Sequence, residues 1–455
     1  MTRKRSPRIV AAILAFGLVA AACGGDDDDA SDTTQAPSDD GADTTEPTES
    51  GAYDLAGVCP DPLVIQTDWF PEAEHGALYQ MVGDDYTVDS DNLTVTGSMW
   101  APGPTPTGID IQVRAGGPAI GFAAPRVQMY TDDSITLGYT TFDSQATNWA
   151  DLPLVSVIAP LEINPQIIMW DADTWPDVKS IADVGAAGMT INVFGGGGFS
   201  DYFVATGVWS ADQVDPSYDG SPARFIAEGN IAQQGFASAE PYNYQNVFTD
   251  YGKAPAYQLL HDAGYQTYSQ TLGVKPDKLE DLRPCLEKLV PIVQQSIVDY
   301  SSAPDRANDM IIDTVAKFAS FWVYDKGLAD YAVETMNRLG LHGNGPDSTV
   351  GNFDEARVQK VIDDARIAGL EVPDDLVAAD MFTNEFIDPS IGFAPGFGGG
   401  DDGEEPSAGG GELQGMKGTT PKGADVSAWI PAVNDWWVAQ GNAELSDFNY
   451  AAESY

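Results

Sequence analysis

The sequence predicts an α/β protein whose folded part divides into two lobes, and three observations support this prediction. Strand-like apolar runs alternate with helix-like stretches over residues 63–236, which is typical of α/β folds. Long helix-like stretches follow from residue 278 onward. The part of the chain that is rich enough in apolar residues to fold has about 340 residues, a length that suits two cores better than one.

Each expected element follows from a local pattern of apolar residues. The expected strands are 63–66, 109–113, 135–139, 154–158, 166–170, 190–193 and 231–236, with a hairpin formed by 86–88 and 93–96. The expected helices are 75–82, 120–130, 279–299, 307–327 and 354–368, the last followed by Gly369. Because strands alternate with helices, we expect mostly parallel sheets with ligands at the carboxyl ends of the strands.

The N-terminal residues combine a basic start, an apolar run and small residues before a cysteine. Four basic residues precede residue 9, residues 9–22 are apolar, and three alanines stand directly before Cys23. This pattern resembles the export signal of a bacterial lipoprotein. An apolar run of about 14 residues is shorter than the ~20 that span a bilayer, so residues 1–22 are expected to be a cleaved signal peptide. The resemblance implies that Cys23 carries acyl chains that anchor an extracytoplasmic protein to the cell membrane. A plain secreted protein with an incidental cysteine is the alternative.

Three further segments lie outside the expected α/β body. Residues 23–52 are acidic, rich in Ser, Thr, Pro and Gly, and lack large apolar side chains, so we expect a disordered tether. Residues 393–424 are rich in Gly, Asp and Glu and are expected to form a flexible linker. Residues 425–455 carry tryptophans at helical spacing, which favours a docked amphipathic helix, with interaction with a partner as the alternative.

The charge of the chain narrows the classes of partner. It has 69 acidic and 22 basic side chains and a formal net charge of −47. Such a chain repels the phosphates of nucleic acid and of anionic lipid head groups. Nucleic acid is therefore not expected as a partner.

Two cysteines remain once Cys23 is assigned to lipid. Cys59 lies just before the first strand, and Cys285 lies in a helix-like stretch far downstream. Thiols of an exported chain can oxidise, so a disulfide between them is expected to join the start of the body to its later half. Two unpaired thiols are the alternative. The sequence has no CxxC motif and no cluster of Cys and His, so a zinc site is not expected.

The segment 68–79 has the clearest ligand-binding pattern. It follows the strand 63–66 and opens a helix, so its aromatic rings and the free amide groups of the helix face one crevice. Trp69 can stack on a flat heterocycle while polar neighbours bind the edge of the ring. An aromatic core residue followed by an acidic first helical turn is the alternative. The candidate ligand-binding residues of this segment are Trp69, Phe70, Glu74, His75 and Tyr79.

Two later segments add candidates. Four glycines before a helix-like stretch can expose backbone amides to an anion or to a planar ligand edge, with a flexible turn as the alternative: Gly195, Gly196, Gly197 and Gly198. Glu240 stands before Pro241 and can present a carboxylate to a ring nitrogen, with an exposed loop acid as the alternative. Because acidic side chains dominate the candidates and no Arg or Lys is among them, the ligand should be uncharged or cationic.

Four segments together resemble one protein family. They are 68–71 at the end of a strand, the glycine-rich turn 194–199, the Glu-Pro segment 239–242, and 382–389. The chain is similar to the solute-binding proteins of ABC importers in the thiamine-pyrimidine and riboflavin branch, which are relatives of nitrate-, sulfonate- and taurine-binding proteins. This resemblance spans about 62–392 and implies a type 2 periplasmic-binding fold with a ligand cleft between two α/β lobes. The implied lobes are 53–154 with 255–392 for lobe 1, and 155–254 for lobe 2.

The resemblance also implies a function. A monomeric, membrane-anchored receptor would capture a small heterocyclic molecule, such as a thiamine pyrimidine precursor or a riboflavin-like compound, and deliver it to an ABC permease without a cofactor or a metal. Binding of nitrate, sulfonate or taurine, and a surface lipoprotein without a transport role, are alternatives.

An enzyme that makes the thiamine pyrimidine is a further alternative. A fungal branch of the family uses a His at a position that resembles His75 and a nearby Lys that holds pyridoxal phosphate. In this chain no Lys lies between Lys4 and Lys179. The sequence also shows no nucleophile motif and no Walker loop, so we expect no catalytic residues and a protein that is not an enzyme.

Overall fold

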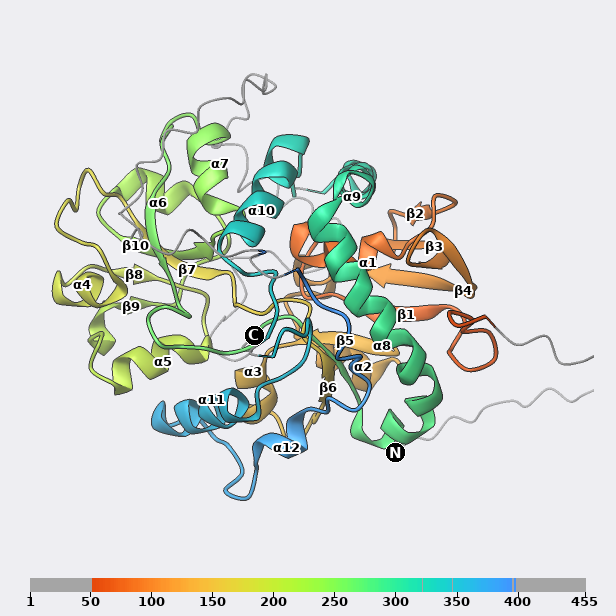
Figure 1. Ribbon diagram of the computed structural model, residues 1–455. Helices are drawn as coiled ribbons and strands as arrows, with labels where there is room; N and C mark the ends of the chain where they lie inside the picture. Colours follow the sequence, from red (N-terminus) through yellow and green to blue (C-terminus); the bar gives the residue numbers. More distant parts are fainter. Residues whose placement is uncertain (1–50, 321, 346, 395–396, 398–455) are drawn as a thin grey trace, which may run out of the picture. The chain divides into compact units, whose positions relative to one another are not determined.

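The computed structural model describes residues 51–320, 322–345, 347–394 and 397 (Figure 1). The expected signal peptide, Cys23, nearly all of the tether, most of the linker and the C-terminal amphipathic segment lie outside the described residues. Within the described residues, no helix combines the length and the apolar character needed to cross a bilayer.

Two sheets organise the described chain and confirm the predicted fold class, an α/β protein of two lobes (Figure 1). The larger sheet has the order β2-β3-β4-β1-β5-β12-β6, and the smaller has the order β11-β7-β10-β8-β9. The strands of the larger sheet are β1 (Leu63–Gln66), β2 (Thr87–Asp89), β3 (Thr94–Ala101), β4 (Thr105–Arg114), β5 (Leu137–Thr140), β6 (Val155–Ile158) and β12 (Thr271–Val274). Those of the smaller are β7 (Gln166–Trp170), β8 (Ile191–Asn192), β9 (Val214–Asp215), β10 (Ala232–Phe236) and β11 (Ala256–Leu259).

The expectation of mostly parallel sheets is wrong. Strand β1 runs parallel to β4 and β5, and β8 runs parallel to β10 and β9, but the other six pairings are antiparallel. Short connections join β2 to β3 and β3 to β4, and only antiparallel strands can be joined by so few residues. Strand β12 adds two more antiparallel pairings, because it enters the larger sheet between β5 and β6 after the chain returns from the smaller one.

The lobes are joined by two segments, 159–165 and 260–270, and one arginine on helix α11 (Glu355–Ile367) binds both of them. Arg357 donates hydrogen bonds to the backbone oxygen of Glu162 (2.9 Å) and to that of Gln266 (2.7 Å). It also forms an ion pair of 3.0 Å with the Glu162 carboxylate. The two connections between the lobes are thus held to the same side chain.

The sheets divide the chain at slightly different places from the lobe boundaries expected at 155 and 254. Strand β6, which starts at residue 155, pairs with β12 in the larger sheet, whereas β11, which starts at residue 256, pairs with β7 in the smaller. The smaller sheet therefore runs from β7 to β11.

The helices of the described chain are α1 (Gly76–Gln80), α2 (Pro125–Thr131), α3 (Phe142–Thr147), α4 (Ile181–Ala186), α5 (Gly198–Ala205), α6 (Ala223–Glu228), α7 (Glu240–Asn246), α8 (Leu279–Ser302), α9 (Asp305–Phe318), α10 (Lys326–Arg338), α11 (Glu355–Ile367) and α12 (Ala378–Met381). Short 3-10 turns are η1 (Ala73–His75), η2 (Gly117–Ile120), η3 (Ala211–Gln213) and η4 (Pro276–Lys278). The long helices expected near 279–299 and 354–368 are confirmed as α8 and α11.

Two expected helices have different limits. The stretch 307–327 is not one helix, because α9 ends at Phe318 and Ala319 has the left-handed conformation, with φ of 51°. Helix α10 then begins after Asp325, whose side chain accepts the backbone N–H of Leu328. The stretch 120–130 becomes helical only at Pro125, because a proline holds the residue before it in an extended conformation and is tolerated in the first turn.

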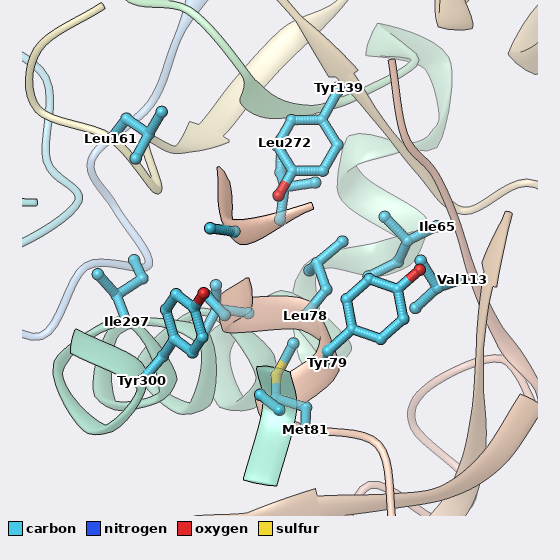
Figure 2. Close-up of a cluster of buried hydrophobic side chains, with 14 of the residues drawn as sticks. Ile65, Leu78, Tyr79, Met81, Val113, Tyr139, Leu161, Leu272, Ile297 and Tyr300 are labelled. Carbon is cyan, nitrogen blue, oxygen red and sulfur yellow. The ribbon is translucent and has the colours of Figure 1, made fainter. Parts of the chain in front are cut away.

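The core of the larger lobe packs α1 and α8 against the larger sheet (Figure 2). Leu78 and Tyr79 of α1 lie there beside Ile65 of β1 and Tyr300 of α8. Helices α1 and α8 approach closely at Gly76, because a Cβ added there would lie 2.0 Å from the ring of Tyr300. The disulfide Cys59–Cys285 joins the segment before β1 to α8 across 226 residues, as predicted.

Candidate functional site

A cavity of about 180 Å³ lies between elements of the two lobes, where several strands end. Its lining includes residues that follow β1, β5, β8 and β10, together with residues just before β12. The acidic lining residues are Asp68, Glu72, Glu74, Asp143 and Glu240. The aromatic ones are Trp69, Phe194, Phe199, Tyr218, Phe236 and Trp322. Uncharged polar side chains complete the set: Thr141, Asn164, Gln166, Gln234, Thr267, Ser269 and Gln270.

Trp69 is the centre of the aromatic wall. Its ring lies 6.0 Å from that of Trp322 and 6.5 Å from that of Phe194, both in edge-to-face geometry. Gly117 leaves room for it, since a Cβ at Gly117 would lie 2.5 Å from the indole ring. Phe194 in turn packs on Tyr218 with ring centroids 4.6 Å apart. Rings from both lobes therefore face the same space.

Trp322 was not predicted as a site residue, because its segment was expected to be helical. The end of α9 at Phe318 instead turns the chain toward the cavity. The indole N–H of Trp322 donates to the backbone oxygen of Pro71 (3.2 Å), and its ring stacks on Phe70 at 6.5 Å. Phe70 and Pro71, which follow β1, thus fix the orientation of the Trp322 ring, which comes from a segment about 250 residues downstream.

Three glutamates meet at the cavity from opposite lobes. Burial, reinforced by Glu74, Asp68 and Glu240, raises the pKa of Glu72 well above its ordinary value. Burial likewise raises the pKa of Glu74 and raises that of Glu240 to about 7. These carboxyl groups therefore hold protons more tightly than exposed carboxyl groups do.

One of these glutamates joins the lobes directly. Glu74, which is 4% exposed, accepts a hydrogen bond from the hydroxyl group of Ser238, a residue that follows β10. Glu240 lies two residues further on, at the start of α7, and its Oε2 accepts the backbone N–H of Phe236 (2.6 Å). The predicted pair Glu74 and Glu240 is thus brought to one cavity from two lobes.

The other predicted residues of the 68–79 segment lie behind the cavity. His75 is fully buried, its Nε2 lies 2.8 Å from Oδ1 of Asp68, and it is absent from the cavity lining. Phe70 and Tyr79 are buried in the core of the larger lobe. Only Trp69 and Glu74 of the five candidates in this segment line the cavity, and Asp68 and Glu72 join them.

Only part of the glycine-rich turn lines the cavity. Gly195 and Gly197 line the cavity, whereas Gly196 and Gly198 are not among its lining residues. The turn is held by β10, because the side-chain oxygen of Gln234 accepts the backbone N–H of Phe194 (3.0 Å).

Two further polar groups were not predicted from the sequence. The Oγ of Ser269 and the Oε1 of Gln270 are buried and have no hydrogen-bond partner among the described residues. Both residues line the cavity, and Gln270 has the left-handed conformation with φ of 54°. Unpaired buried polar atoms at a cavity wall are groups that a ligand can satisfy. Neither residue lies in a recognisable motif, so only the folded arrangement reveals them.

A second cavity of about 310 Å³ lies within the larger lobe, between the tip of the β3–β4 hairpin and α8. Its charged lining residues are Asp299 and Arg306. Arg306 is already engaged, because its guanidinium lies 5.0 Å from the ring of Trp100 and donates to the backbone oxygen of Val82 (2.8 Å). We therefore regard the cavity between the lobes as the candidate site.

Comparisons with known proteins find similarity of structure only. No family model matches the chain, and no curated protein matches it. Among solved structures, the periplasmic aliphatic sulphonate binding protein SsuA of Escherichia coli is 14% identical, covers 78% of this chain and 99% of its own, and has a TM-score of 0.45. The periplasmic nitrate-binding protein NrtA of Synechocystis PCC 6803 is 10% identical, with 72% and 88% covered and a TM-score of 0.47.

A Candida albicans protein that is described as having the generic periplasmic binding protein fold is similar at the same level. It is 12% identical, with 71% of this chain and 96% of that chain covered and a TM-score of 0.43. At such identities and scores, none of these structures identifies a ligand for this chain. The order and direction of the strands describe two mixed α/β sheets independently of these comparisons.

Proposed function

We propose that this protein is a membrane-anchored, extracytoplasmic solute-binding protein that delivers a small heterocyclic molecule to an ABC importer. The observation that carries the proposal is the cavity between the lobes, which both lobes line with aromatic rings and carboxyl groups. A site shared by two lobes suits a receptor that closes on its ligand.

The size of the cavity favours a small ligand. Its volume of about 180 Å³ is below the ~300–1,000 Å³ typical of pockets for drug-sized molecules. A single-ring heterocycle of the thiamine-pyrimidine type therefore suits it better than a three-ring flavin does. Trp69 offers such a ring a stacking partner, and the neighbouring carboxyl groups offer acceptors or donors to its edge.

Charge argues against the anionic alternatives. Among the described residues, five acidic side chains and no Lys or Arg line the cavity. Nitrate, sulfonate and taurine present negatively charged oxygens, which proteins bind with cationic groups or several backbone amides.

The residues that line the cavity also argue against a pyridoxal-phosphate enzyme. No Lys of the part of the chain that the structure describes lines the cavity, and His75 lies behind it with Nε2 at 2.8 Å from Oδ1 of Asp68. The residue types that the enzymatic branch requires are therefore not presented to a ligand.

A thermal-shift screen with pyrimidines, thiamine, flavins and sulfonates tests the proposal. A ligand at 100 times its Kd should stabilise the folded protein by about 2.7 kcal/mol. Trp69→Leu should abolish the shift, whereas Trp100→Leu, which alters the second cavity, should preserve it. A thermal shift that is lost only in Trp100→Leu would place the ligand in the second cavity instead. The absence of any thermal shift would favour the surface lipoprotein without a transport role.

The anchor is tested separately. Cys23→Ser should release a protein into the medium that still binds its ligand, because acylation and ligand binding use different parts of the chain. Loss of ligand binding in this variant would contradict that separation.

A further inference from the structure

We propose that the ligand carries a positive charge, which is held by Glu72, Glu74 and Glu240 against the aromatic wall of the cavity. This inference rests on the proposed function of the same cavity and specifies its ligand as a planar cation. Nitrogen heterocycles with a protonated or alkylated ring nitrogen, and amidinium groups, belong to this class.

The first step is the balance of charge inside the cavity. Two of its acids already have partners: Asp68 lies 2.8 Å from the His75 ring nitrogen, and Asp143 accepts from the Tyr265 hydroxyl group (2.8 Å). The charged groups that act on Glu72 are other carboxylates. Among the described residues, Glu240 likewise has no ion pair. A cationic ligand would supply the missing counter-charge.

The second step is the aromatic wall. Trp69, Trp322 and Tyr218 line the cavity together with Phe194, and their rings lie within 4.6–6.5 Å of a neighbouring ring. A cation within about 6 Å of an aromatic face gains electrostatic energy, most of all with Trp, and the gain increases when water is excluded. An anion at the same place meets the negative face of each ring.

The third step concerns protons. Because burial favours the neutral carboxyl group, the three glutamates hold protons that exposed carboxyl groups would have lost. A bound cation favours the carboxylate form, so its binding should release protons.

The titratable groups that face the three glutamates from neighbouring elements are Asp68, His75, Tyr79, Tyr139, Tyr218, Tyr244, Tyr300, Tyr324 and Tyr331. The pKa of each of these tyrosines is raised by burial, so they stay neutral between pH 5 and 9.

Three probes of nearly equal shape isolate the charge. Benzamidine is a planar cation at neutral pH, benzamide is its neutral counterpart, and benzoate is the anion. Titration calorimetry with the folded protein should show benzamidine binding at least about 10-fold more tightly than benzamide, and no binding of benzoate. Repeating the titration in buffers of different ionisation enthalpy should show proton release with benzamidine alone.

Isosteric variants assign the effect to the glutamates. Glu72→Gln and Glu240→Gln should each weaken benzamidine by about 10- to 100-fold and leave benzamide unchanged. Glu287→Gln, on the exposed face of α8, is the matched control and should change neither. Circular dichroism on each variant establishes that it is folded.

The outcomes separate this inference from the proposed function. Tighter binding of benzamide or benzoate than of benzamidine, or benzamidine binding that is indifferent to both variants, overturns the cationic ligand while leaving a receptor in place. If none of the three probes and no member of the thermal-shift screen binds, the proposed function itself is overturned.

Discussion

The pKa of Glu240 leads to a quantitative prediction about stability. Burial, with a smaller contribution from Glu74, raises this pKa from 4.5 to about 7 in the folded protein. The unfolded chain has the ordinary value, so the folded state binds the proton more tightly between pH 4.5 and 7. At about 1.36 kcal/mol per pKa unit, this difference is worth roughly 3 kcal/mol. The contribution is fully present below pH 4.5 and is lost as the pH rises through 7.

Glu240→Gln removes this dependence on pH, because glutamine cannot ionise and can still accept the backbone N–H of Phe236. Relative to the parent, the variant should gain about 3 kcal/mol of unfolding free energy between about pH 4.5 and pH 8.5. Urea unfolding followed by tryptophan fluorescence measures both proteins across this range. Glu287→Gln should follow the parent at every pH. If the unfolding free energies of Glu240→Gln and the parent change in parallel with pH, the raised pKa of Glu240 does not contribute to stability.

Two further predictions concern covalent and steric constraints. Replacing Cys59 and Cys285 with serine should lower the unfolding free energy by up to about 5 kcal/mol, the chain-entropy value for a loop of 226 residues, measured by urea unfolding. Gly117→Ala should displace the Trp69 ring and lower both the melting temperature and ligand affinity, because the new Cβ would lie 2.5 Å from that ring. Gly188 has a similar positive φ, but a Cβ added there would have no atom within 4 Å, so Gly188→Ala should lower only the melting temperature. Equal effects of the two variants on ligand affinity would contradict the clash between residue 117 and the Trp69 ring.

The strands and the longest helices could be predicted because their signals are local. The apolar run at β1 and the amphipathic pattern of α11 stand out in the sequence, and both occur where they were expected. The direction of β12 could not be predicted, because it depends on where the chain re-enters the larger sheet. The end of α9 was missed as well, since an alanine at residue 319 carries no local signal for the left-handed conformation.

The candidate site was predictable only where chemistry and position coincide in a short segment. Trp69 and Glu74 follow a clear strand and line the cavity, and Glu240 does so from the other lobe. His75 has the right chemistry but faces the core, because successive residues of the helical turn at η1 point in different directions. Trp322 and Gln270 reach the cavity only through tertiary folding, so no spacing in the sequence associates them with Trp69.

The position of Glu74 connects ligand charge to the contact between the lobes. Its carboxyl group lines the cavity and accepts the hydroxyl hydrogen of Ser238 from the opposite lobe. A hydrogen bond to an ionised carboxylate is about twice as strong as one to a neutral acceptor. A cation that favours the ionised form of Glu74 therefore strengthens the bridge to Ser238, whereas a neutral ligand does not. In the proposed receptor, this bridge is therefore a contact between the lobes through which the charge of a ligand can favour closure.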